Sequence, residues 1–78
     1  MIVAADVEQL AKIAFAIADG EPARSPERRA ASHLWISSTI PPARSLAAVR
    51  RAAESYGTPT TQADALALLD RITRQEKS

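Results

Sequence analysis

The first segment of the chain has the hydrophobic spacing of an amphipathic helix. Its apolar residues recur at steps of three and four, which places them on one stripe of a helix: Val3, Val7, Leu10, Ala14 and Ile17. Gly20 follows as a residue that stops helices. On the opposite side, Glu8 and Lys12 stand four residues apart in the order that favours an ion pair. The pattern predicts a helix over residues 3–18.

A second helix is predicted after the stretch "EPARSP". Ser25 is suited to cap a helix whose first residue is Pro26. The apolar side would consist of Ala30, Ala31, Leu34 and Trp35. The tail "LWISSTI" is rich in residues that prefer extended backbone, and Pro41 pushes the residue before it out of the helical region. We therefore expect a helix over residues 26–36, followed by a loop.

A third helix is predicted between Pro42 and Gly57. Pro42 suits a helix start, and Gly57 suits the left-handed residue that follows a helix end. Arg50 and Glu54 are spaced to pair across one helical turn. The pattern predicts a helix over residues 42–56 with a regular apolar stripe, made by Leu46, Val49, Ala53 and Tyr56.

The last helix is predicted to begin at a threonine cap. Thr60 or Thr61 can cap it, and Thr61 with Asp64 approximates a capping box. A broad apolar face follows, made by Ala65, Leu66, Leu68, Leu69 and Ile72. We expect a helix over residues 61–75 and a frayed tail at residues 76–78.

Four short helices with short connections and no convincing hairpin predict an all-α fold, a compact bundle in which residues 1–78 form one domain. A chain of this length buries only about 60% of its unfolded surface, so its core is small. There is no cysteine to reinforce it. Helix packing has to supply the stability, and pairing of two chains as a homodimer is a possible addition.

Charge is distributed unevenly along the chain, although the formal total is only +1. Residues 1–21 hold four acidic residues against one lysine, a net of −3. Residues 22–57 hold six arginines against two glutamates, a net of +4, and the remainder is balanced. Arginine suits the recognition of phosphate or carboxylate, because its planar fork can form two parallel hydrogen bonds. The candidate partner-binding residues are Arg28, Arg29, Arg44, Arg50 and Arg51.

The sequence offers little with which to build a catalytic or cofactor site. His33 is the only histidine and there is no cysteine, so no metal-ligand cluster is expected, and we interpret His33 as a partly exposed helix residue. The two glycines are isolated and cannot form a phosphate-binding loop. We expect no enzymatic activity, no cofactor and no metal. The first segment carries charges within its apolar run, so neither a signal peptide nor a membrane span is expected, and the default location is the cytoplasm.

For two aromatic residues the spacing allows more than one environment. Phe15 lies about 120° from the centre of the first apolar stripe, and it either packs beneath the following loop or is exposed as a contact for a partner. Trp35, at helical spacing from Ala31 and Leu34, is expected in the core, with an interface as the alternative.

The stretch from Arg50 to Leu69 resembles the helix-turn-helix motif. Ala53 supplies a small residue in the first helix, and Gly57, four residues later, can adopt a positive φ. The resemblance implies base contacts from the start of the second helix, through Thr60, Thr61 and Gln62, with arginines on phosphates. Ala63 and Asp64 depart from the pattern, since such motifs usually carry a larger apolar residue and little negative charge there.

Our interpretation of the sequence is a non-enzymatic helical binding module. It would act as a small regulator, adaptor or inhibitor through protein–protein interaction, using the five arginines above together with Phe15. The alternative is a helix-turn-helix DNA-binding regulator that uses residues 42–73.

Overall fold

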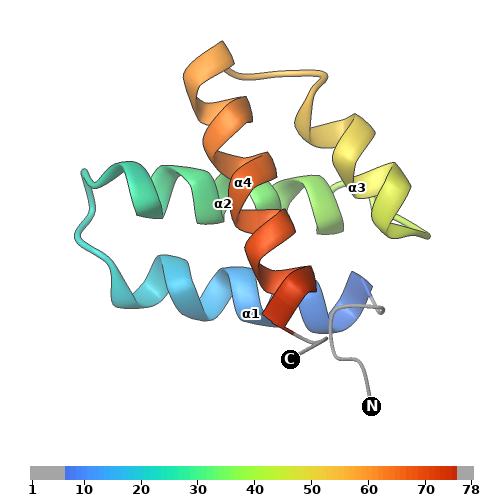
Figure 1. The fold of residues 1–78 in the computed structure, drawn as a ribbon, viewed down its shortest axis with the longest axis horizontal. Helices are drawn as coiled ribbons and strands as arrows, with labels where there is room; N and C mark the ends of the chain where they lie inside the picture. The colour runs from blue at the N-terminus through green and yellow to red at the C-terminus, as the bar shows by residue number, and fades with distance from the viewer. Residues whose placement is uncertain (1–6, 76–78) are drawn as a thin grey trace.

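The computed structural model describes residues 7–75, and side chains as far as Thr73. Over this range the chain forms helices and no strand, which confirms the predicted all-α class (Figure 1). The predicted helical residues 3–6 and the predicted frayed tail lie outside the described residues. In chain order the helices are α1 (Val7–Gly20), α2 (Pro26–Thr39), α3 (Leu46–Ala53) and α4 (Pro59–Gln75).

The helices α1 and α2 form an antiparallel pair, and α4 crosses one face of that pair (Figure 1). The short α3 lies at the end of the molecule where α2 finishes. The core lies between these helices and is built from small and medium-sized apolar side chains: Leu10, Ala14, Ala18, Ala31, Leu34, Val49, Leu68, Leu69 and Ile72. This arrangement covers one face of the α1–α2 pair with α4.

Helix α1 follows its predicted stripe. Leu10 and Ala14 are fully buried, while Val7 and Ile17 are partly buried against the same core. The helix continues to Gly20, two residues beyond its predicted end. The expected pair of Glu8 and Lys12 is present on the exposed side, at 3.5 Å.

Helix α2 is longer than predicted, and the expected loop over residues 37–39 is wrong. Ser25 caps the helix as predicted, because its Oγ accepts a hydrogen bond from the Arg28 amide at 3.1 Å. At the other end, the hydroxyls of Ser37, Ser38 and Thr39 each donate to the carbonyl oxygen four residues earlier, at 2.7, 2.8 and 2.8 Å. These bonds satisfy the hydroxyls locally, so residues with a preference for extended backbone fit a helical turn.

Helix α3 is shorter than predicted at both ends. It begins at Leu46 because the Oγ of Ser45 accepts from the Ala48 amide at 3.1 Å. Pro42 lies in the preceding turn, where it bridges to Thr39. The helix ends at Ala53, so Tyr56 belongs to the connection over residues 54–58 and not to the helix.

Helix α4 begins two residues before its predicted start. The cap is Thr58, whose Oγ1 accepts from the Thr61 amide at 3.2 Å, and Pro59 occupies the first helical position. The predicted caps at Thr60 or Thr61, and the capping box with Asp64, are therefore wrong. A threonine directly before a proline provides the stronger start signal.

Candidate functional site

His33 is a buried structural residue, which corrects the expectation of a partly exposed one. Only 6% of its surface is accessible. Its Nε2 lies 2.7 Å from the carbonyl oxygen of Ala53, and because a carbonyl can only accept, Nε2 carries the hydrogen. The imidazole also stacks on Tyr56, with ring centroids 4.1 Å apart. Tyr56 in turn donates its hydroxyl hydrogen to the His33 carbonyl at 3.0 Å. His33 thus anchors the end of α3 and the following connection to α2.

Gly57 is required by this anchoring contact. It has a φ of +82°, and a Cβ built there would lie 2.8 Å from the Cε1 of His33. A residue with a side chain would meet both backbone strain and a collision. The prediction that this glycine has left-handed backbone is confirmed, although it lies within the connection and not directly after a helix.

The five candidate arginines do not form one basic surface. Arg28 and Arg29 lie in the first turn of α2, while Arg50 and Arg51 lie on α3, at the other end of the molecule (Figure 1). The fifth, Arg44, precedes α3. The positive middle third of the sequence is therefore divided between two ends of the fold.

Three of these arginines make contacts within the chain. The Nη1 of Arg28 lies 3.5 Å from the Glu21 carbonyl oxygen, and that of Arg29 lies at the same distance from the Arg24 carbonyl oxygen. Arg50 pairs with Asp70 of α4 at 2.8 Å, both side chains being partly exposed.

The predicted pair of Arg50 with Glu54 is accordingly wrong, because the side chain of Arg50 reaches across to α4. Arg44 and Arg51 are both exposed.

Phe15 forms an aromatic pair with Trp35 on the surface of the α1–α2 pair. Phe15 is 57% exposed, and its ring centroid lies 5.9 Å from that of Trp35 with the planes tilted by 48°. Trp35 is partly buried and packs against the core, so the expectation of a core position is met only in part. Of the two interpretations of Phe15, the exposed aromatic is the one that the structure shows.

This pair lies on the face that α4 leaves uncovered. Ile17 and Ala30 line a cleft beneath Leu68 of α4. Successive side chains of a helix are rotated by about 100°. Phe15, two residues from Ile17, is therefore rotated by about 200° from the side that α4 covers. Trp35, five residues from Ala30, is rotated by about 140° from that side. We call the surface around Phe15 and Trp35 the aromatic face.

A shallow groove continues along the α1–α2 pair, with a volume of about 670 Å³. Its lining includes Glu8, on the same stripe as Phe15, and Thr39, one turn beyond Trp35. Arg44 contributes the cationic group of the groove. The aromatic face is therefore bordered by a depression with charges of both signs.

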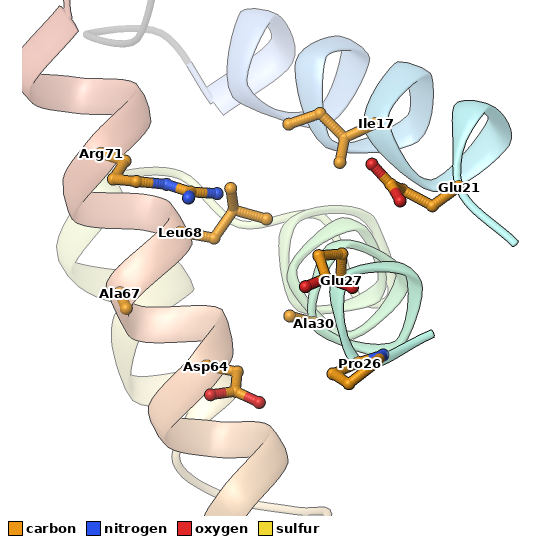
Figure 2. A pocket seen from close by; sticks show the side chains of 9 residues that line it. All are labelled: Ile17, Glu21, Pro26, Glu27, Ala30, Asp64, Ala67, Leu68 and Arg71. Atoms are coloured by element: carbon orange, nitrogen blue, oxygen red, sulfur yellow. The ribbon is translucent and has the colours of Figure 1, made fainter. Parts of the chain in front are cut away.

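The cleft beneath Leu68, of about 410 Å³, lies between α1, α2 and α4 (Figure 2). Apolar side chains line part of it, while Glu21, Glu27 and Asp64 contribute carboxylates and Arg71 a guanidinium. Figure 2 shows Asp64 and Arg71 on α4, across the cleft from the two glutamates. Sequence reasoning did not find this cleft, because its acidic residues come from segments whose crossing is not visible in the spacing of any one helix.

The three residues proposed for base contacts differ in whether their side chains already form hydrogen bonds within the chain. Thr60 is exposed, whereas the hydroxyl of Thr61 accepts from Thr58 at 3.0 Å. The amide nitrogen of Gln62 donates to the carbonyl oxygens of Tyr56 and Gly57, at 2.7 and 3.2 Å. Two of the three side chains are thus engaged in holding the connection before α4.

Within residues 7–75, no three histidine, aspartate or glutamate side chains come close enough to hold a metal ion. Over the same residues, each helix is too short or too polar to span a bilayer. Comparisons of the chain with family models, with curated proteins and with solved structures find no match.

Proposed function

We propose that the protein is a non-enzymatic binding module that acts as a small regulator, adaptor or inhibitor by docking onto another protein chain. The docking surface is the aromatic face. The proposal includes a cytoplasmic location, in keeping with a chain that contains no cysteine.

The observation that carries the proposal is the exposure of Phe15 against Trp35. A small domain with little core gains stability by burying its large side chains. Here the only phenylalanine and the only tryptophan of the chain are next to each other on a surface, and Phe15 remains more than half exposed. Exposed aromatic groups with a polar surround are typical of protein interfaces, where they contribute a large share of the binding energy.

The charged groups around the aromatic face would orient a partner. Arg28 borders the face on α2, and Arg44 borders the groove that continues from it. Arg29 lies next to Arg28 and is exposed. Charges at the rim of an interface contribute mainly to specificity and to the rate of association. Arg50 and Arg51 lie on α3, so they are secondary candidates for this surface.

Affinity capture with the wild-type chain and two variants tests the proposal. The wild-type chain, Phe15→Ala and Thr60→Ala would be used as immobilised baits under identical conditions, with folding checked by circular dichroism. Because both replaced side chains are exposed, neither substitution should unfold the domain. We expect the wild type and Thr60→Ala to retain the same protein, and Phe15→Ala to lose it. Equal retention by all three baits would contradict the proposal.

DNA binding through residues 42–73 remains the second candidate. The exposure of Thr60 and Arg51 and the positive φ of Gly57 favour it. The internal hydrogen bonds of Thr61 and Gln62 weigh against it, because base reading would require those bonds to be exchanged.

A further inference from the structure

We propose that the occupant of the aromatic face is a second copy of this chain, placed so that α1 of one copy lies over α2 of the other. This inference rests on the proposed protein-binding function of that face and names its partner. It follows from the solvent exposure and the charge of two stripes of side chains, one on α1 and one on α2.

The two stripes differ in solvent exposure. On α1, the residues that share the stripe of Phe15 are all exposed and form a ridge: Glu8, Lys12, Phe15 and Asp19. On α2, the residues that share the stripe of Trp35 are all partly buried, and we call this stripe the recess because its side chains are less exposed than those of the ridge: Arg28, Ser32, Trp35 and Thr39. A stripe of exposed side chains beside a stripe of partly buried ones is an arrangement that a second copy, turned over, can complement in both directions.

The two stripes also differ in charge. Two carboxylates and one lysine give the ridge a net of −1, and Arg28 gives the recess a net of +1. A ridge over the same ridge would bring like charges together, whereas a ridge over the recess brings opposite charges together. Electrostatic complementarity therefore selects one of the two ways in which the faces can meet.

Two-fold symmetry satisfies this pairing. A two-fold axis that lies in the interface, parallel to the helices, places α1 of each copy over α2 of its partner and keeps the same end of both molecules together. Asp19 near the end of α1 and Arg28 near the start of α2 lie at that common end. The Asp19 carboxylate of each copy then lies near the Arg28 guanidinium of the other, so this contact occurs twice. Phe15 of each copy then lies level with Trp35 of the other, because the two rings are at the same level within one chain and the axis does not shift residues along the helices.

The first test is the oligomeric state of the full chain. Sedimentation equilibrium over micromolar to near-millimolar concentrations should give a reversible dimer for the wild type. Asp19→Arg should weaken the dimer about five- to tenfold, since it replaces an attraction by a repulsion. Arg28→Asp should do the same, and the double variant Asp19→Arg/Arg28→Asp should recover most of the affinity. Asp64→Arg, on α4, is the matched control and should leave the dimer unchanged.

Cysteine pairing gives a second readout that does not depend on affinity. The chain has no cysteine, so each single-cysteine variant can form a disulfide only with another molecule. A mixture of Asp19→Cys and Arg28→Cys should form the mixed disulfide faster than either variant forms its own. A mixture of Asp64→Cys and Arg28→Cys should not show this preference.

Several outcomes would overturn the inference. These are a monomer at all concentrations, a double variant that is no better than the single ones, or a mixed disulfide without preference. A monomeric wild type that still captures another protein through Phe15 would refute the second copy as the occupant while leaving the proposed function intact. If the dimer forms, but Phe15→Ala captures another protein as well as the wild type does, the second copy stands as the occupant of the aromatic face. The proposed function is then refuted for other partners only.

Discussion

His33 of α2 donates a hydrogen bond from its buried imidazole to the carbonyl oxygen of Ala53, the last residue of α3, at 2.7 Å. This contact joins residues twenty positions apart and closes one end of the fold. Because α3 is only eight residues long, it cannot be stable by its own propensity and depends on such anchors.

The first prediction concerns this anchor. His33→Phe keeps a ring against Tyr56 but leaves the Ala53 carbonyl without its donor, so it should lower the free energy of unfolding by about 1–3 kcal/mol. Tyr56→Phe removes the bond to the His33 carbonyl and the 3.3 Å contact with the Ser37 hydroxyl, both partly buried, and should cost about 0.5–1.5 kcal/mol. Urea denaturation followed by circular dichroism measures both. If His33→Phe were as stable as the wild type, the anchoring role would be refuted.

The second prediction compares the two glycines. Gly57→Ala should destabilise the protein by about 1–3 kcal/mol, since a Cβ there is strained at positive φ and collides with His33. Gly20→Ala is the control, because a Cβ at that position meets nothing within 4 Å. It should be neutral or stabilising by up to about 1 kcal/mol. Thermal melts should therefore give a lower Tm for Gly57→Ala and an unchanged or higher Tm for Gly20→Ala, and an equal loss in both variants would argue against the strain at Gly57.

The third prediction concerns the size of the core. Leu69 is 1% exposed, and Leu69→Ala should cost about 2–5 kcal/mol. Total stabilities are only about 5–15 kcal/mol, so this single truncation can bring the domain close to unfolding. Ile40→Ala, at a side chain that is 63% exposed, removes a comparable volume and should change the stability by less than about 0.5 kcal/mol. Similar losses at the two positions would contradict the assigned core.

The fourth prediction separates the two candidate functions. A protein that binds through the aromatic face should not retain duplex DNA even at about 50 mM salt. If α4 reads bases instead, retention should fall steeply between about 50 and 200 mM salt, as phosphate contacts are screened. Thr60→Ala should then reduce sequence preference while leaving the fold intact. Fluorescence anisotropy with a randomised duplex pool distinguishes the two results.

The sequence was sufficient to predict the helical class and most of the buried stripes, because spacing of apolar residues reports directly on helix faces. Ser25 was also identified correctly as a cap. The ends of the helices were harder to predict from the sequence. At Ser37 and Ser38, hydroxyl bonds to the preceding turn overcame the local preference for extended backbone, and a propensity argument does not include such bonds.

The sites were harder to predict than the helices, since they depend on which helices meet. His33 looked exposed because its burial comes from Tyr56 and Gly57, far along the chain. Arg50 looked paired within its own helix, yet its partner Asp70 belongs to another. For Phe15 the sequence predicted two alternatives. Its position off the apolar stripe fitted either a place beneath the following loop or an exposed contact, and the structure was needed to show the exposed one and the adjacent Trp35.

Site-specific photo-crosslinking in the host cell tests the central claim most directly. A photoreactive phenylalanine analogue would replace Phe15 in one variant and Ala63, exposed on α4, in the other. Protein docking on the aromatic face predicts a discrete protein adduct, either a second copy or another chain, from position 15 and none from position 63. Adducts to nucleic acid from position 63, with none from position 15, would contradict it.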